Sequence, residues 1–185
     1  MKHDIHHRHS IRLRGYDYSQ AGAYFVTVCV QRHECLFGDV ANGKMRLNDA
    51  GRTAQTAGEG LPDHFPSVEL DTFVVMPNHV HGIIVLVGAG LALPKRGAAS
   101  SAPTTPTLGN VMRAFKSISA INVNRLLSRS GQSLWQRNYY EHIIRDAESL
   151  DRIREYIVAN PLRWALDREN PRRTGEDEFG LYEMP

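Results

Sequence analysis

Apolar residues recur along this chain with two periods, one typical of strands and the other of helices. Four runs rich in β-branched and aromatic residues predict strands. They cover residues 23–30, 68–75, 80–87 and 139–144. The second and third runs are separated by the turn signal Pro77-Asn78, which predicts an adjacent strand pair. The shorter segment 39–47 contains Asn42-Gly43 and predicts a hairpin.

Three segments with helical spacing or helix-start signals predict helices. Asn48 or Asp49 is expected to cap a helix that runs to about Gly60, followed by a loop around Pro62 and Pro66. The longest helix is expected at 107–128, where apolar residues return every three or four positions. The last is expected at 147–160 and should stop at Pro161, because proline interrupts helical hydrogen bonding.

The order strand, helix, strand, strand, helix, strand predicts a ferredoxin-like or RRM-like α+β sandwich. An antiparallel sheet would carry helices on one face, with an added C-terminal helix. The 185 residues suffice for one domain, which we place at 21–165, after a flexible basic arm at 1–20 and before a C-terminal tail at 166–185. The Ala-, Pro- and Thr-rich stretch 88–106 is expected to be a flexible insert.

Composition favours a cytoplasmic protein. Hydrophobic residues make up 42% and charged residues 23%, which is ordinary for a globular domain. The sequence has neither a run of 18 apolar residues nor a secretory signal at its start, so no membrane association is expected. Cys29 and Cys35 are too few for a disulfide framework and are expected to be two buried free thiols, with metal ligation as the alternative.

The net charge of +2 is unevenly distributed. Residues 107–145 hold six basic residues against one acid, whereas 146–185 hold ten acids and six bases. A basic middle on a near-neutral chain favours a polyanion-binding face, although a solvated helix face would have the same composition. The candidates for phosphate contact and base stacking are Arg113, Lys116, Trp135, Arg137 and Arg145.

The motif His79-Val80-His81 is the most informative feature for chemistry. Residues two apart on a strand point to the same side, about 6–7 Å apart along the backbone. Two imidazoles in this arrangement suit ligands that converge on one metal ion. The alternative is one buried, hydrogen-bonded histidine and one in solvent.

A second candidate pair lies on the last expected helix. Tyr156 and Asn160 are four residues apart and therefore neighbours on one side of the helix. A tyrosine beside an amide oxygen offers a nucleophile and a metal ligand to one site. The alternative is a half-buried aromatic residue beside an asparagine that ends the helix.

Together these segments resemble the single-tyrosine HUH transposases, and among them most closely the REP-associated tyrosine transposases. The resemblance extends from about Ile11 to Trp164. The matching segments are residues 75–82, which read VMPNHVHG, residues 134–145, LWQRNYYEHIIR, and residues 154–161, REYIVANP. The insert 88–106 and the tail after Asp167 depart from the family pattern, and we expect neither to bear on the chemistry.

The resemblance implies that His79 and His81 bind Mg²⁺ or Mn²⁺, with Asn160 as the third ligand and Tyr156 as the nucleophile. Such an enzyme cleaves and rejoins single-stranded DNA, here expected to be hairpin-forming repeats in the nucleoid, through a 5′-phosphotyrosine. It acts as a monomer or a homodimer. Tyr139 and Tyr140 are rivals for the nucleophile and are assigned to packing or base stacking.

Two other functions account for part of the sequence. A module that holds DNA or RNA hairpins without cutting them would explain the basic residues and the aromatic residues. A metal-dependent hydrolase that activates water would explain His79 and His81. The first leaves the histidines and the Tyr156–Asn160 pair without a role, and the second leaves Tyr156 without one.

Overall fold

A four-stranded antiparallel sheet forms the centre of the structure, a computed structural model that describes residues 16–88 and 106–175. Its spatial order is β4-β5-β1-β6. The strands are β1 (Gly22–Cys29), β4 (Val68–Val75), β5 (His79–Leu86) and β6 (Tyr140–Ile144). With a helix between β1 and β4 and another between β5 and β6, this is the βαββαβ order of ferredoxin-like folds, as the sequence predicted.

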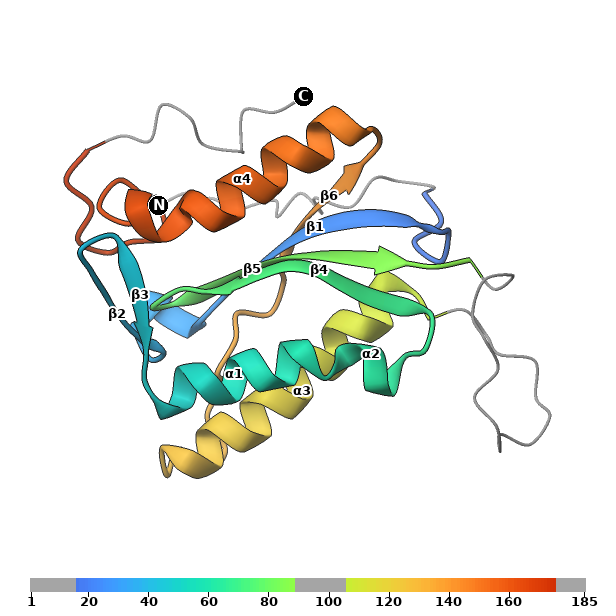
Figure 1. The fold of residues 1–185 in the computed structure, drawn as a ribbon. Helices are drawn as coiled ribbons and strands as arrows, with labels where there is room; N and C mark the ends of the chain where they lie inside the picture. The colour runs from blue at the N-terminus through green and yellow to red at the C-terminus, as the bar shows by residue number, and fades with distance from the viewer. Residues whose placement is uncertain (1–15, 89–105, 176–185) are drawn as a thin grey trace, which may run out of the picture.

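Helices cover both faces of the sheet (Figure 1). Helices α1 (Asp49–Glu59) and α3 (Leu108–Leu126) pack on one face, and α4 (Ala147–Arg163) lies on the other. Each face has its own apolar core. Val26 and Val28 of β1 belong to the larger core on the α1 and α3 side, whereas Phe25 belongs to a smaller core with Ile153 and Ile157 of α4.

The strand register determines which side chains face α4. In β1 and β5, Thr27 lies opposite His81 and Cys29 lies opposite His79. Opposed residues of an antiparallel pair project from the same face, and side chains alternate along each strand. Because Phe25 faces α4, Thr27 and Cys29 do so too, and both histidines lie with them.

Each long helix starts at a capping residue, and the cap predicted at Asn48 is confirmed. Asn48 Oδ1 accepts a hydrogen bond from the Gly51 amide at 2.9 Å, Thr107 Oγ1 accepts from Asn110 at 3.2 Å, and Asp146 Oδ1 accepts from Ser149 at 2.7 Å. Each bond satisfies an amide that has no partner within its helix. The starts of α1, α3 and α4 are therefore encoded locally.

One predicted helix boundary and part of one predicted loop are wrong. Helix α4 continues through Pro161 to Arg163, because the fixed φ of proline fits helical geometry and only one hydrogen bond is lost in the final turn. The expected loop at Pro62 contains a short helix, α2 (Leu61–His64), with the proline in its first turn, where a missing amide hydrogen costs nothing.

The predicted hairpin is confirmed and lies beside the end of α4. It consists of β2 (Gly38–Ala41) and β3 (Lys44–Leu47). Asn42 and Gly43 both have positive φ, 53° and 70°, as a two-residue turn of this type requires. A Cβ at Gly43 would lie 2.7 Å from Leu162 Cδ1, so the turn packs closely against the last turn of α4.

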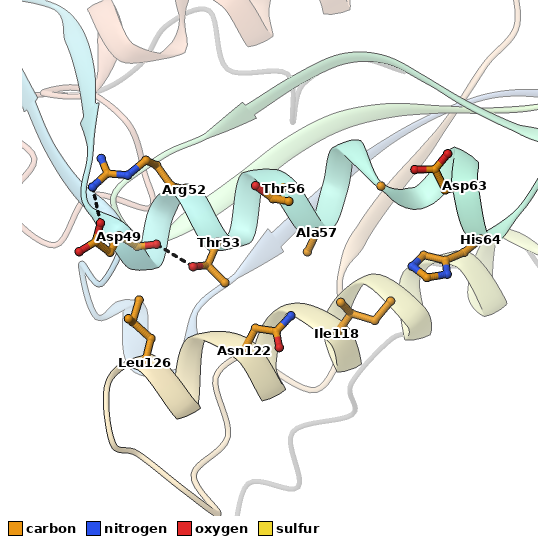
Figure 2. A pocket seen from close by; sticks show the side chains of 11 residues that line it. Asp49, Arg52, Thr53, Thr56, Ala57, Asp63, His64, Ile118, Asn122 and Leu126 are labelled. Carbon is orange, nitrogen blue, oxygen red and sulfur yellow. Dashed lines mark hydrogen bonds and ion pairs between the residues drawn. The ribbon is translucent and has the colours of Figure 1, made fainter.

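A cavity of about 740 Å³ lies between α1 and α3 (Figure 2). These helices cover the face of the sheet opposite to the one that carries His79 and His81. Its wall includes Thr53, Thr56 and Ala57 from α1 and Ile118, Asn122 and Leu126 from α3. Neither histidine of the His79-Val80-His81 motif lines it. The cavity and the candidate metal ligands His79 and His81 therefore lie on opposite faces of the sheet.

Within residues 16–88 and 106–175, no helix has the length and apolar character to span a bilayer. Most of the expected arm, insert and tail lie outside the described residues, at 1–15, 89–105 and 176–185.

Candidate active site

The two histidines of β5 converge beneath α4. Nε2 of His79 lies 3.0 Å from Nε2 of His81, and the two side chains are 0% and 1% exposed. Two nitrogen ligands about 2.1 Å from one cation and at right angles to each other are about 3.0 Å apart. The pair therefore has the spacing of adjacent ligands in a metal coordination shell.

The other ring nitrogen of each histidine has a polar partner. His79 Nδ1 lies 2.9 Å from Asn78 Oδ1, and His81 Nδ1 lies 2.8 Å from Thr27 Oγ1 across the strand pair. The amide oxygen of Asn78 can only accept a hydrogen bond, so His79 Nδ1 donates and His79 Nε2 keeps its lone pair. Such partners orient imidazole ligands at metal sites.

Burial lowers the pKa of both imidazoles. For His81 the pKa falls well below its usual 6.5, through burial first and the neighbouring His79 second. For His79 burial also dominates, although Asp167 and Glu169 partly oppose it. Both rings are therefore neutral near pH 7, which is the state that binds metals.

Two buried oxygen atoms border the histidine pair. Asn160 Oδ1 and Asp167 Oδ2 have no hydrogen-bond partner among the described residues. Asp167 Oδ2 lies 3.8 Å from His79 Nε2, and its side chain is 4% exposed. Asn160, 2% exposed, is close enough to His79 to oppose the lowering of that ring's pKa by burial, after Asp167 and Glu169. An unpaired buried carboxylate oxygen is costly, and a cation would remove that cost.

The donor set fits a divalent cation. His79, His81 and Asp167 each offer one ligand atom, and these atoms all lie within 4.8 Å of one another. With Asn160 Oδ1 they make a set of two imidazoles and two oxygen atoms. Imidazole suits transition metals, and carboxylate and amide oxygen atoms suit Mg²⁺ and Mn²⁺. A site of this kind is compatible with Mn²⁺ on both counts.

Tyr156 packs directly against this group. It is on the sheet-facing side of α4 with Ile153, Ile157 and Asn160, and it is 8% exposed. Its ring centroid is 5.3 Å from that of His81 and 6.2 Å from that of Phe25. The spacing of four residues between Tyr156 and Asn160 therefore brings both side chains to the histidines.

An ion pair anchors α4 to the sheet two residues before Tyr156. Arg154 donates from Nε to Asp71 Oδ1 at 3.0 Å and from Nη2 to Asp71 Oδ2 at 2.6 Å. Hydrogen bonding from this guanidinium lowers the pKa of the Asp71 carboxyl. Two parallel bonds restrict rotation as well as distance, so the contact helps to set the position of the helix on β4.

Asp167 and Glu169 are the site residues that the sequence did not reveal. They follow α4 in a segment that turns back over the histidines, and Asn78 Nδ2 donates to the Glu169 carbonyl oxygen at 2.6 Å. The chain after Asp167, which we expected not to bear on the chemistry, thus contacts the candidate site through Glu169. No periodicity marks such a contact, which joins residues 91 positions apart.

The rival tyrosines lie on opposite faces of the sheet. Tyr140 is opposite Thr27 on β6, half-buried, with its ring 6.1 Å from Phe25 and thus on the same face as His81. Burial raises the pKa of its phenol. Tyr139 packs on the larger core, on the α1 and α3 side. Tyr140 is therefore the nearer competitor of Tyr156.

The proposed stacking residue Trp135 is in the core, which corrects the sequence-based assignment. It is 6% exposed, its indole packs on Phe37 and Phe115, and its Nε1 donates to Ser119 Oγ at 2.9 Å. The basic residues near it in the sequence had favoured an exposed position in a DNA-binding surface. The apolar body of tryptophan instead fills the layer between β1 and α3.

The basic candidates do not form one cluster with the histidines. Arg113 and Lys116 are on α3, across the sheet, and Lys116 Nζ donates to the carbonyl oxygens of Gln136 and Arg137 at 2.6 and 2.9 Å. Arg145 follows Ile144, which pairs with Ala23, at the end of β1 away from the histidines. Arg113, Arg137 and Arg145 have exposed side chains.

Comparison with known proteins identifies relatives of this chain in sequence and in fold. The sequence is 44% identical over 172 residues to an uncharacterized protein of Haemophilus influenzae, covering 89% of this chain and 93% of that protein. The chain belongs to the same family as that protein. No family model matches the sequence.

Two further matches concern REP-associated tyrosine transposases. A Haemophilus influenzae protein provisionally named as one is 27% identical over 147 residues, which cover 80% of this chain and 74% of that protein. A solved REP-associated tyrosine transposase bound to a REP hairpin superposes with a TM-score of 0.56 at 21% identity, over 83% of this chain and 73% of that one. The chain thus resembles this group in sequence and shares its fold.

Proposed function

We propose that the protein is a metal-dependent endonuclease and strand transferase for single-stranded DNA, with Tyr156 as its nucleophile. One observation carries the proposal. The ring of Tyr156 lies against His81, whose Nε2 is 3.0 Å from that of His79. Buried oxygens of Asn160 and Asp167, without a hydrogen bond to any described residue, lie beside this pair. A tyrosine in contact with a set of metal ligands is suited to attack on a phosphodiester.

The comparisons support the choice of substrate. The solved transposase of the same fold is bound to a REP hairpin. The Haemophilus influenzae relative with 27% identity is provisionally named a REP-associated tyrosine transposase. For this chain we therefore propose hairpin-forming repeats as the DNA class. Exposed arginines, Arg113 and Arg137 among them, would contact the backbone phosphates.

In the proposed step, Tyr156 Oη attacks the scissile phosphorus and the bond to the 3′ oxygen breaks. The phenolic proton passes to solvent, and the leaving 3′ oxygen takes up a proton. The product is a 5′-phosphotyrosine with a free 3′-hydroxyl. Because the phosphodiester energy is kept in the covalent bond, a second 3′-hydroxyl can reverse the reaction and join a new strand without ATP.

The protein groups each have a part in this step. His79, His81, Asn160 and Asp167 would hold Mg²⁺ or Mn²⁺, which supplies Lewis-acid polarisation of the phosphate when it is bound. Asn78 and Thr27 orient the two imidazoles. The packing of Tyr156 between Phe25 and His81 holds its ring in place before the substrate binds.

A covalent adduct tests the proposal. The full-length protein is incubated with a labelled single-stranded hairpin substrate and Mn²⁺, then denatured and separated by gel electrophoresis. We expect a protein–DNA band that survives the denaturant and maps to Tyr156 by peptide mass spectrometry. Cleavage without an adduct would indicate water activation instead, and retention of DNA without cleavage would indicate a binding module.

A further inference from the structure

A second group of potential metal ligands lies beside the histidine pair and takes no part in the proposed cleavage. It consists of Cys29 at the end of β1, His33 in the short 3₁₀ segment Gln31–His33, and Glu169 in the segment after α4. Their ligand atoms all lie within 4.8 Å of one another. Cys29 Sγ is 3.4 Å from Glu169 Oε2, and His33 Nδ1 is 3.0 Å from the same oxygen.

These separations match a tetrahedral zinc shell. A thiolate sulfur about 2.3 Å from zinc and a carboxylate oxygen about 2.0 Å from it are about 3.5 Å apart at the tetrahedral angle. An imidazole nitrogen and a carboxylate oxygen are about 3.3 Å apart in the same geometry. The observed distances of 3.4 Å and 3.0 Å differ from these values by a few tenths of an ångström.

The nitrogen of His33 that faces this group is closed to solvent. His33 Nδ1 is buried and forms no aligned hydrogen bond within the described part of the chain, although Glu169 Oε2 is 3.0 Å away. The carboxylate itself is only 10% exposed. A buried imidazole nitrogen, a buried carboxylate and a thiol thus meet at one oxygen of Glu169, whose other oxygen accepts from Arg168 Nε at 3.2 Å.

We propose that Cys29, His33 and Glu169 form a second metal site, separate from the His79–His81 pair and suited to Zn²⁺. The mixed sulfur, nitrogen and oxygen donor set favours a borderline cation over Mg²⁺. A water molecule would complete the shell on the side where His33 is open to solvent, since its side chain is 42% exposed. This site does not depend on the proposed cleavage chemistry.

Metal binding at this point requires two proton changes. Burial raises the pKa of the Cys29 thiol, with the Glu169 carboxylate as the second cause, so the thiol keeps its proton at neutral pH. Binding a divalent cation would release that proton to solvent. His33 Nε2 would carry the ring proton, and Gln136, now 3.0 Å away through its amide nitrogen, would turn its oxygen toward it.

The site would act as a clamp on the segment after α4. Glu169 comes from that segment, whereas Cys29 and His33 come from β1 and the turn after it. The Glu169 amide donates to Asp167 Oδ1 at 2.7 Å, so a fixed Glu169 also fixes the carboxylate next to His79. Zinc at the second site would therefore stabilise the arrangement of the first, without touching substrate.

Cobalt provides the direct test, because a thiolate ligand produces a charge-transfer absorption band that histidine and carboxylate ligands do not. The full-length reduced, metal-free protein is titrated with Co²⁺, and we expect this band to rise to one equivalent. Cys29→Ser and Glu169→Gln should remove or strongly weaken the band. Cys35→Ser is the matched control, because Cys35 is exposed and outside the cluster, and it should leave the band unchanged.

The His79→Ala/His81→Ala double variant separates this site from the proposed active site. It should keep the cobalt–thiolate band while losing cleavage. Zinc should also protect Cys29, and not Cys35, from alkylation by iodoacetamide, as mapped by mass spectrometry. Absence of the band in the folded wild-type protein, or its persistence in Cys29→Ser, would overturn the proposal whatever the outcome of the cleavage assay.

Discussion

Asn78 links His79, a candidate metal ligand, to Glu169 in the segment that follows α4. Its Oδ1 accepts from His79 Nδ1 at 2.9 Å, while its Nδ2 donates to the carbonyl oxygen of Glu169 at 2.6 Å. The side chain is fully buried. One amide thus selects the tautomer of His79 and holds the segment that brings Asp167 to the same ring.

Replacing Asn78 by alanine should therefore affect both metal binding and stability. Loss of the partner to His79 is expected to weaken metal affinity by about 10- to 100-fold. The buried groups left without partners should lower the free energy of unfolding by about 1–3 kcal/mol. Calorimetric titration with Mn²⁺ and urea unfolding measure the two effects. Asn138→Ala, at an exposed position, is the control, and equal effects in both variants would contradict the assignment.

Asp167→Asn tests the carboxylate that the sequence did not reveal. If Asp167 Oδ2 is a ligand, the change removes a negative charge from the shell and should reduce Mn²⁺ affinity at least tenfold. The variant should remain folded, because the amide keeps the size of the side chain. Asp151→Asn, an exposed position on α4, should leave affinity unchanged. Wild-type Mn²⁺ affinity in Asp167→Asn would remove Asp167 from the site.

Tyr156→Phe should fold, bind metal and DNA, and form no covalent adduct. The substitution removes one hydroxyl and keeps the ring contacts with Phe25 and His81. Tyr140→Phe is the most demanding control, since Tyr140 faces the same side of the sheet. It should still form the adduct. An adduct in Tyr156→Phe that disappears in Tyr140→Phe would move the nucleophile to β6.

Trp135 and Arg137 are two positions apart in the sequence and should behave differently. Trp135→Phe leaves Ser119 Oγ without the indole donor and should reduce stability by about 1–3 kcal/mol, with little effect on DNA affinity. Arg137→Ala should leave stability unchanged, weaken DNA binding and reduce the log–log salt slope by about one unit. Fluorescence anisotropy at several salt concentrations, with thermal unfolding, distinguishes the two. Unchanged affinity and salt slope in Arg137→Ala would leave Arg137 as a solvated side chain.

The buried histidines predict an acid-sensitive fold in the absence of metal. Burial lowers the pKa of both rings below the usual 6.5, so the unfolded chain takes up protons that the folded chain does not. Their contribution to stability is complete above about pH 6.5 and is lost as the pH falls from there toward the lowered values. The loss is at most about 1.4 kcal/mol per pH unit for each ring.

Urea unfolding in EDTA between pH 7.5 and pH 5 measures this dependence. The His79→Gln/His81→Gln double variant is the reference, because it retains all other titrating groups. We expect the wild-type protein to lose stability more steeply than the variant below pH 6.5. Parallel curves would mean that the rings do not remain neutral in the folded state.

Local sequence determined several parts of this protein. Residues 79–86 form a strand, and successive side chains of a strand point in opposite directions. His79 and His81 must therefore share a face of any sheet that contains this strand. The spacing of Tyr156 and Asn160 likewise requires a common side of α4. The helix starts at Asn48, Thr107 and Asp146 depend on hydrogen bonds within three residues, and the cap at Asn48 was predicted for that reason.

Tertiary structure alone decided which of these surfaces meet. Helix α4 covers the histidine face while α1 and α3 cover the other, and this follows from how the two apolar cores close. The burial of Trp135 and the approach of Asp167 and Glu169 depend on contacts between segments many residues apart. Such contacts leave no periodic trace, because their free energy comes from packing and from pairing buried polar groups after the chain has folded.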